Sequence, residues 1–278
     1  PLDAGIYDLK NNPLQTIYQA AHHLFLASAK AVIAFKKMNR YGKIGMMLGY
    51  EPAYPRTCHP EDVLLAEKSE DELLFFSDVQ IRGEYPAYMK KFFYDHHISL
   101  EIKDEDFIIL KQGRVDYLAL SYYSSAVCSS DPLLEKKRGN IIYSVDNPYL
   151  KKTRWGWQID PVGLETSLIK LYNRYHLPLF LVECGIGVKE EYAFCIQDDY
   201  RIEYYREHLI HLKKAIDYGV EMLGFLAWSP IDMPSAASGE IEKRYGFVYV
   251  NADNNGNGDY QRSKKKSFDW YKKVISTN

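Results

Sequence analysis

The sequence lacks any apolar run that approaches the ~20 residues needed to cross a bilayer, so we expect no membrane-spanning helix. It also lacks an excess of one charge, because 35 Lys and Arg residues nearly balance 37 Asp and Glu residues. No overall positive field is therefore available to recruit nucleic acid or an anionic membrane. Residues 1–12 carry no basic-then-apolar signal pattern, and we expect a cytoplasmic protein.

Two further absences argue against cofactor and metal sites. No strand-like run is followed by the glycine-rich fingerprint of a dinucleotide-binding sheet. Cysteine is scarce, and its four copies have neither the paired spacing of a zinc site nor the density of a disulfide scaffold. We interpret them as free thiols and predict no metal site. The cysteines are Cys58, Cys128, Cys184 and Cys195.

The composition is that of a globular protein. The 278 residues are 46% hydrophobic and 26% charged, which makes disorder an unlikely interpretation. Aromatic residues are frequent, with 24 Tyr and 4 Trp. Aromatic rings often form the walls of sugar sites, but they also fill large cores, and composition leaves both interpretations open.

Helices and strands are predicted to alternate along the chain. A helix is expected over Leu14–Phe35, whose apolar residues recur at helical spacing and should face the core. These residues are Ile17, Ala20, Ala21, Leu24, Ala27 and Ala31. Short apolar runs typical of strands lie at 43–49, 115–123, 178–183 and 222–228, and further helices are predicted over 161–175, 202–218 and 263–275. This alternation predicts parallel strands joined by crossover helices, either in a doubly wound sheet or in a barrel.

Residues at the strand ends favour the barrel. Tyr122 and Tyr123, Glu183, and Trp228 end three of the predicted strands on the C-terminal side, where a (β/α)8 barrel keeps its active site. Four strands make only half of such a barrel. We interpret residues 1–278 as a single domain, with 50–111 as an irregular, lid-like insertion that is helical in part over Asp71–Phe93.

Glu183 is the strongest candidate for a catalytic residue. A carboxylate placed directly after a buried strand is held rigidly and is only partly solvated, which suits a nucleophile for a sugar C1. Tyr123, at the end of another strand, could donate a hydrogen bond that keeps the carboxylate ionised and oriented. A strand-end glutamate that pairs with a basic neighbour, and a half-buried core tyrosine, are equally acceptable interpretations of the spacing.

The segment 235–246 brings hydroxyl groups, two cations and a phenol together after the last predicted strand. The serine hydroxyls and the tyrosine hydroxyl of this segment could donate directional hydrogen bonds to a phosphate, while its lysine supplies a point charge. A solvated polar loop explains the same composition, and on composition alone it is the commoner case.

Several long segments resemble glycoside hydrolase family 1, and most closely its bacterial 6-phospho-β-glucosidases. The resemblance extends over nearly the whole chain, and these segments carry it. They are YQAAHHLFLASAKAV (18–32), FFSDVQIRGEYPAYM (75–89), VDYLALSYY (115–123), RWGWQIDPVGLETSL (154–168), PLFLVECGIG (178–187), WSPIDMPSAASGEIEKRYGFVYV (228–250) and KKSFDWYKKVI (265–275).

The resemblance implies a (β/α)8 TIM barrel, of which this chain would supply roughly the C-terminal half, strands 5–8. It implies a retaining hydrolase of 6-phospho-β-D-glucosides that works by double displacement, with Glu183 as the nucleophile. Tyr123 matches the tyrosine that orients the nucleophile, and Trp228 matches the tryptophan that floors the sugar subsite. No cofactor is implied, because two carboxylates and a water suffice.

The element with which the phosphoglycosidases grip the sugar 6-phosphate matches Ser235, Lys243 and Tyr245. Ser238 could share or take the role of Ser235. Cys184 replaces the asparagine of the family's V/T-E-N-G motif, which could affect the orientation of the nucleophile.

The family's acid/base glutamate lies in an N-E-P or N-E-I motif, and no such motif occurs in the 278 residues. We therefore expect a fragment that lacks general acid catalysis, a loss of ~10²–10⁴-fold. The exposed edges of a half-barrel would invite pairing with the missing N-terminal half or with another copy. Two alternatives stay open: an inactive half-barrel that binds sugar phosphate or self-associates, and a 6-phospho-β-galactosidase.

Overall fold

The computed structural model describes residues 13–39, 41–189, 195–236 and 238–277. Residues 1–12, on which the expectation about a signal pattern depends, lie outside this range. The chain forms two compact units, Pro1–Leu48 with Glu67–Ala119, and Gly49–Ala66 with Leu120–Asn278, called unit 1 and unit 2 below. No helix in the described part of the chain is long and apolar enough to span a membrane.

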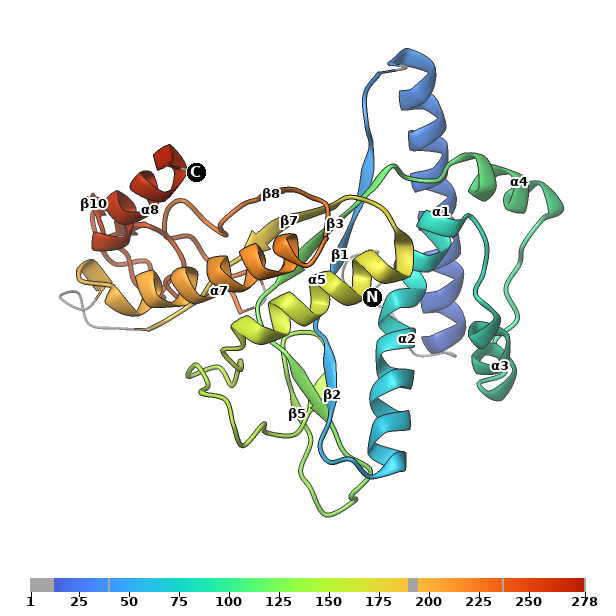
Figure 1. Cartoon of the computed structure of the whole chain (residues 1–278), viewed down its shortest axis with the longest axis horizontal. Helices are drawn as coiled ribbons and strands as arrows, with labels where there is room; N and C mark the ends of the chain where they lie inside the picture. Colours follow the sequence, from blue (N-terminus) through green and yellow to red (C-terminus); the bar gives the residue numbers. More distant parts are fainter. Residues whose placement is uncertain (1–12, 40, 190–194, 237, 278) are drawn as a thin grey trace. The chain divides into compact units, whose positions relative to one another are not determined.

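Unit 1 is mainly helical. Its helices pack around an aromatic cluster in which the ring centroids of Phe25 and Phe75 lie 5.3 Å apart and those of Tyr18 and Phe93 also lie 5.3 Å apart. Its elements are α1 (Pro13–Met38), most of β1 (Gly45–Gly49), most of α2 (Pro60–Arg82), α3 (Ala87–Asp95) and α4 (Asp104–Gln112), all labelled in Figure 1.

The predicted buried face of α1 was wrong, although the helix itself is confirmed. Of the six residues expected inside, only Ala21 is buried, whereas Leu24 is 50% exposed and Ala27 and Ala31 are exposed. The sequence of α1 is apolar on more than one side, so its periodicity did not select one face. The large aromatic residues decided the orientation. The buried residues are Tyr18, Ala21, His22, Phe25, Ala29 and Val32.

The prediction for 50–111 is confirmed for its helical part at Asp71–Phe93, which lies in α2 and α3, and was wrong in expecting the rest to be irregular. The segment is mostly helical, with α2 as its longest element. Helix α2 begins at Pro60, a favoured first helical residue, and Glu61 and Asp62 lie in its first turn, where carboxylates complement the helix dipole. The part of α2 that precedes Asp71 was not predicted, because its charge-rich sequence shows little apolar periodicity.

Unit 2 contains the α/β part of the chain. A four-stranded sheet has the order β1-β3-β7-β8, to which β3 (Tyr117–Tyr122) contributes residues of both units. Strands β7 and β8 are parallel, with Leu179 opposite Met222. The other elements of unit 2 are β2 (Ala53–Pro55), β4 (Ala126–Cys128), β5 (Lys137–Arg138), β6 (Tyr143–Ser144), α5 (Pro161–Tyr175), β7 (Leu179–Cys184), α7 (Asp199–Asp217), β8 (Met222–Phe225), β9 (Val248–Val250), β10 (Arg262–Lys264) and α8 (Lys266–Thr277).

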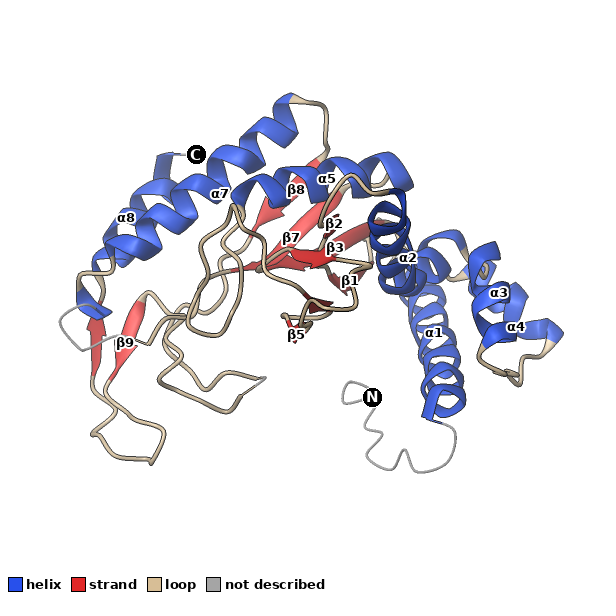
Figure 2. Ribbon diagram, turned by 90° about the horizontal axis from the view of Figure 1, so that it is seen from below, coloured by secondary structure: helices blue, strands red, loops and turns tan. Residues whose placement is uncertain are grey.

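Helices α5 and α7 lie side by side along one face of β7 and β8 (Figure 2). Helix α5 starts where the sequence predicts, because Asp160 caps it by accepting a hydrogen bond from the Gly163 amide (2.8 Å) and Pro161 follows as the first helical residue. It ends at Tyr175, and the following residue, His176, caps it in a left-handed conformation. The predicted alternation of helices and strands is thus confirmed.

Strand β8 is shorter than predicted. It ends at Phe225, so Trp228 lies in the segment beyond the strand. The Trp228 amide still donates to the Cys184 carbonyl (2.8 Å), which keeps the segment beside the end of β7. The final helix begins at Lys266 rather than Ser263, because Ser263 pairs with Tyr249 in the β9–β10 hairpin. The four cysteines are free thiols, as predicted.

His208 of α7 makes stability depend on pH. It is fully buried, its Nδ1 lies 2.7 Å from the Tyr204 carbonyl oxygen, and its Nε2 has no partner among the described residues. Burial lowers the pKa of His208 to about 4, whereas an unfolded histidine titrates near ~6.5. The unfolded state therefore binds the extra proton first as the pH falls.

We expect the free energy of unfolding to fall as the pH drops from about 6.5 towards 4, with His208 contributing on the order of 2–3 kcal/mol. The His208→Gln variant should show a shallower loss in chemical denaturation at several pH values. His23→Gln, at an exposed position of α1, is the matched control and should keep the wild-type slope. An unchanged slope in His208→Gln would contradict this assignment.

Candidate active site

Glu183 and Tyr123 meet as the sequence predicts. The Tyr123 hydroxyl donates to Glu183 Oε2 at 2.9 Å. Both side chains are partly buried, Glu183 near the end of β7 and Tyr123 directly after β3. Burial, and then the charge of Glu183, raise the pKa of Tyr123 far above its usual range. Tyr123 therefore remains a proton donor, and it fixes one oxygen of the carboxylate.

Lys243 lies in a cage of aromatic rings. Its Nζ is 3.9 Å from the ring centroid of Trp157, 5.0 Å from that of Trp155 and 5.6 Å from that of Tyr245. The residue is only 3% exposed, and among the described residues it has no ion pair. Burial lowers its pKa to about 8, and the nearby carboxylate of Glu240 partly opposes this shift. An anionic ligand would be the natural partner of such a cation.

Ser235 and Tyr245 complete this arrangement. Both are buried, and their hydroxyl groups form a hydrogen bond with each other. Ser238, the alternative to Ser235, is exposed, and its side chain instead bonds to Glu240. The geometry therefore groups Ser235, rather than Ser238, with Lys243 and Tyr245.

The rings connect this cluster to Glu183. The Tyr123 ring lies 5.5 Å from the Trp157 ring, which in turn lies 6.5 Å from the Tyr245 ring. Tyr123 thus contacts the carboxylate on one side and the lysine cage on the other.

Arg201 positions the segment that carries Lys243. This fully buried residue of α7 donates from its guanidinium to the carbonyl oxygens of Ile186 (2.9 Å), Arg244 (3.0 Å) and Tyr245 (2.6 Å). Its Nε donates to Asp198 at 2.8 Å, which compensates the buried charge. The loop after β7 is thereby joined to the lysine segment.

Gly187 shows how closely these segments approach. A Cβ at Gly187 would lie 2.8 Å from Lys243 Cγ and from the Tyr245 ring, so only glycine allows this packing without displacement.

Cys184 does not take part in the site. Its side chain is fully buried, and its Sγ lies 3.6 Å from the Tyr204 hydroxyl of α7. Because neighbouring residues of a strand point to opposite faces, Cys184 faces the helix layer while Glu183 faces the other way. Trp228 is half-buried, and its Cβ approaches the position next to Cys184, at Gly185.

Sequence reasoning missed Trp155, Trp157, Glu240 and Arg201. The Trp155 indole N–H donates to Glu240 Oε2 at 3.1 Å, so this pair closes the cage around Lys243. The sequence did contain a sign of the two tryptophans' importance. Two of the chain's four tryptophans occur within the three residues Trp155-Gly156-Trp157. The sequence shows only the local pairing of Arg201 with Asp198, because its backbone partners, the carbonyls of Ile186, Arg244 and Tyr245, lie in distant segments.

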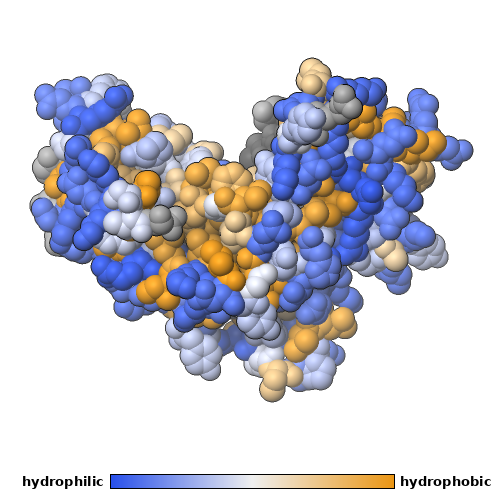
Figure 3. Space-filling model, turned by 45° about the horizontal axis from the view of Figure 1, so that its top comes forward, coloured by the Kyte–Doolittle hydropathy of each residue, from blue (hydrophilic) through white to orange (hydrophobic). Residues whose placement is uncertain are grey.

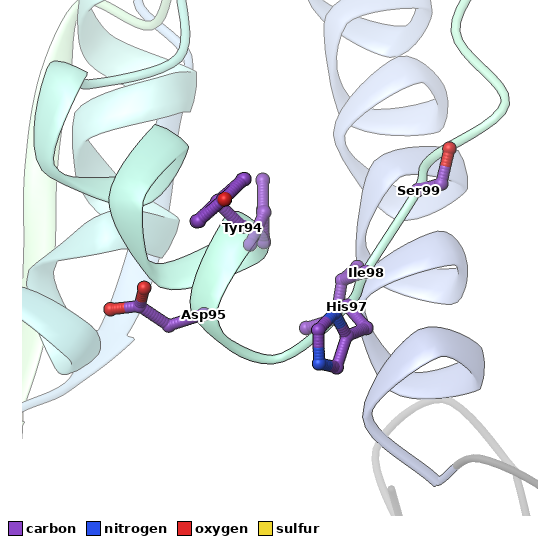
Figure 4. A pocket seen from close by; sticks show the side chains of 6 residues that line it. Tyr94, Asp95, His97, Ile98 and Ser99 are labelled. Atoms are coloured by element: carbon purple, nitrogen blue, oxygen red, sulfur yellow. The ribbon is translucent and has the colours of Figure 1, made fainter.

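Two other hollows among the described residues gather no catalytic groups. One of about 580 Å³ in unit 1 lies beside the end of α3, where the side chains of Tyr94, Asp95 and His97 point in different directions (Figure 4). Another, of about 730 Å³, is lined mainly by apolar residues of unit 2 such as Phe247 and Phe268. Apolar side chains also reach the surface elsewhere, among the charged residues (Figure 3).

We expect Glu240→Gln to lower the pKa of Lys243 below about 8, because the substitution removes the attraction that opposes desolvation. The amide oxygen of glutamine can still accept from Trp155, so the cage stays closed. NMR titration of the lysine ε-carbon would measure the shift. Glu242→Gln is the control, since Glu242 pairs with Lys189 instead. An unaltered Lys243 titration in Glu240→Gln would refute the assigned interaction.

Comparison with curated proteins gives a consistent set of relatives. The chain is 50% identical over 276 residues to an aryl-phospho-β-D-glucosidase of Bacillus subtilis, covering 98% of this chain and 59% of the relative. It is 48% identical over 265 residues to a phospho-cellobiase of Klebsiella oxytoca, covering 94% of this chain and 57% of the relative. A 6-phospho-β-glucosidase of Escherichia coli is 44% identical over 276 residues, with shares of 98% and 58%. The chain therefore spans less than two thirds of the length of these proteins.

Comparison with solved structures also finds β-glucosidases. A family 1 β-glucosidase of Thermotoga maritima is similar with a TM-score of 0.78 at 28% identity, over 93% of this chain and 56% of that one. A β-glucosidase of Exiguobacterium marinum gives a TM-score of 0.77 at 27% identity, with shares of 93% and 57%. These neighbours imply the (β/α)8 barrel as the fold of the family. Residues 4–278 match glycosyl hydrolase family 1 along their whole length, and the chain belongs to this family.

Proposed function

We propose that this chain carries the nucleophile and the phosphate-binding half of a retaining hydrolase of 6-phospho-β-D-glucosides. The observation that carries the proposal is the connection of Glu183 through Tyr123 and Trp157 to the caged Lys243. The names of relatives that are 44–50% identical, all phospho-β-glucosidases or phospho-cellobiases, support the same substrate class.

In the first step, a carboxylate oxygen of Glu183 attacks C1 of the sugar, the bond from C1 to the leaving oxygen breaks, and that oxygen keeps the electron pair. Water then attacks C1 of the inverted glycosyl ester, the bond from C1 to the Glu183 oxygen breaks and its electron pair returns to the carboxylate, and one proton of the water passes to the departed oxygen through the solvent, which leaves the sugar with its original configuration. Tyr123 donates to one carboxylate oxygen, so the other is free to attack. Its raised pKa keeps the phenol protonated throughout.

The phosphate would bind at Lys243, Ser235 and Tyr245. An ammonium in an apolar cage attracts a dianion strongly, because little water competes for either charge. Since the pKa of Lys243 is lowered to about 8, the empty site loses its charge as the pH rises through that value. Binding of a phosphorylated sugar should therefore weaken above pH 8. Trp228 would pack against the sugar ring between Glu183 and the phosphate-binding residues.

We further propose that residues 1–278 act as one domain that supplies strands 5–8 of the family's barrel. The strand order β1-β3-β7-β8 and the share of 57–59% in the curated relatives support this. An N-terminal half would supply the complementary strands and the acid/base glutamate. Alternatively, a second copy of the chain would cover the exposed strand edges of the half-barrel. Free thiols fit a reducing compartment such as the cytoplasm.

The nucleophile can be tested without an acid catalyst. A 2,4-dinitrophenyl 2-deoxy-2-fluoro-6-phospho-β-glucoside has a leaving group that departs unprotonated and forms a slowly hydrolysed ester. We expect intact-mass and peptide mass spectrometry to show one glycosyl adduct on Glu183. Glu183→Gln should remain unlabelled, whereas Glu221→Gln, at an exposed carboxylate of unit 2, should label normally. A folded chain without any adduct would favour the inactive, sugar-phosphate-binding alternative.

The phosphate site has its own test. We expect Lys243→Met to weaken binding of glucose 6-phosphate by about 10–100-fold in calorimetry, the value of one charge-assisted hydrogen bond. Lys264→Met is a matched control, because Lys264 also lies over an aromatic ring, 4.6 Å from the Phe268 centroid, but outside the site. Tighter binding of galactose 6-phosphate than of glucose 6-phosphate would favour the galactosidase alternative.

A further inference from the structure

Glu51 is a buried carboxylate of unit 2 that the candidate active site does not include. It is 1% exposed and lies in the segment between β1 and β2. Its Oε1 accepts hydrogen bonds from the Ser124 hydroxyl (2.7 Å) and from the Asn140 amide (3.2 Å). Its Oε2 accepts from the amides of Ile141 (2.7 Å) and Ile142 (2.9 Å). A carboxylate offers about four acceptor positions, so these four donors use its whole capacity.

The segment that carries Glu51 runs beside the end of β3 and the residues that follow it. The Tyr50 amide donates to the Ser121 carbonyl (3.1 Å), and the Ala126 amide donates to the Pro52 carbonyl (2.9 Å). Glu51 lies between these two hydrogen bonds along the chain. Its backbone is therefore held on the same framework as the end of β3, and its side chain can act as a fixed support.

Tyr123 has an anchored residue on each side. The Tyr122 hydroxyl donates to the Asp160 carbonyl at 2.6 Å, and the Ser124 hydroxyl donates to Glu51 at 2.7 Å. Tyr122 and Ser124 are both buried, so little water competes for these hydrogen bonds. Because each residue has only two soft backbone dihedrals, fixing both neighbours restricts the residue between them. The direction in which the Tyr123 hydroxyl reaches the carboxylate of β7 therefore depends on both anchors.

The two anchors differ in what a substitution can remove. The partner of Tyr122 is a backbone carbonyl, whereas the partner of Ser124 is a side chain. The same side chain also holds the turn 139–142 between β5 and β6, because three successive amides of this turn point at it. A Cβ at Gly139 would lie 3.2 Å from Glu51 Oε1, so the turn packs directly against the carboxylate. Glu51 is thus the group on which both Ser124 and the turn depend.

We infer that Glu51 is a positioning residue, which acts through Ser124 to hold Tyr123 in the orientation that fixes the nucleophile, without touching the substrate. The inference rests on the proposed function and adds a residue to the machinery that orients Glu183. Loss of this support lets the Tyr123 hydroxyl move away from the carboxylate, which slows attack on C1. A misplacement of about 1 Å can cost ~10²-fold in rate. Phosphate binding involves other segments and should be insensitive to the loss.

The rate at which the fluorinated phosphoglucoside labels Glu183 measures this effect. We expect Glu51→Gln and Ser124→Ala each to lower the maximal labelling rate by about 10-fold, while the dissociation constant of glucose 6-phosphate changes by less than about 2-fold. In the double variant the two losses should not add, because both substitutions break the same hydrogen bond. Ser124→Ala leaves the turn bonded to Glu51, so it carries the test if Glu51→Gln does not fold.

Asp62→Asn is the matched control for the loss of a buried carboxylate. Asp62 is also buried and also accepts four hydrogen bonds, from the amide and hydroxyl groups of Thr57 and Ser130, but neither donor residue adjoins the candidate site. This variant should lose stability and keep the labelling rate of the unsubstituted chain. An equal loss of labelling in Asp62→Asn and Ser124→Ala, or unchanged labelling in Ser124→Ala, overturns the inference.

A spectroscopic measurement separates the inference from the proposed function. If the unsubstituted chain is not labelled, the proposed function fails, but NMR of ζ-carbon-labelled tyrosine still reports the hydrogen bond of Tyr123, whose signal is assigned with Tyr123→Phe. Ser124→Ala should shift this signal. Ser125→Ala should not, because the Ser125 hydroxyl has no partner among the described residues. A Tyr123 signal that stays in place in Ser124→Ala, or moves equally in Ser125→Ala, overturns the inference.

Discussion

The buried guanidinium of Arg201 is the interaction on which the site depends. Three carbonyl oxygens from two segments far apart in sequence point at one side chain, and Asp198 balances its charge. A second network repeats the design: Asp232 accepts from Lys265 (2.8 Å) and from the Gly246 amide (2.9 Å). Neither network touches the proposed substrate. The Arg201 and Asp232 networks supply the hydrogen bonds that a loop lacks when it is not part of a helix or sheet. These hydrogen bonds hold the segment that carries Lys243 and Tyr245 in place.

The sequence predicted the parts of the molecule that obey local rules. Strand β7 is a short apolar run, and α5 begins with the capping residue Asp160 followed by Pro161. The positions of such elements can be predicted from residues that are adjacent in the sequence. The contact of Tyr123 with Glu183 also followed, because the C-terminal ends of parallel strands meet at one edge.

The features that the sequence did not predict depend on contacts between segments that are far apart in the chain. The buried face of α1 is set by rings that arrive from α2 and α3, which no periodicity within α1 contains. The cage around Lys243 likewise joins residues 88 positions apart, counting from Trp155 to Lys243 (243 − 155 = 88). Family resemblance supplied Lys243 itself, but the depressed basicity of its amine follows only from the three rings that surround it.

The distribution of the cysteines has a practical consequence. Cys58 is exposed, whereas the other three are buried. Burial raises the pKa of Cys184, directly behind the nucleophile, to about 12, so almost none of it is thiolate at neutral pH. A maleimide dye would therefore attach to Cys58 in the folded chain without any engineered mutation. Reaction of a second thiol would then report that a region which buries Cys128, Cys184 or Cys195 has opened, so the unaltered protein can report its own unfolding.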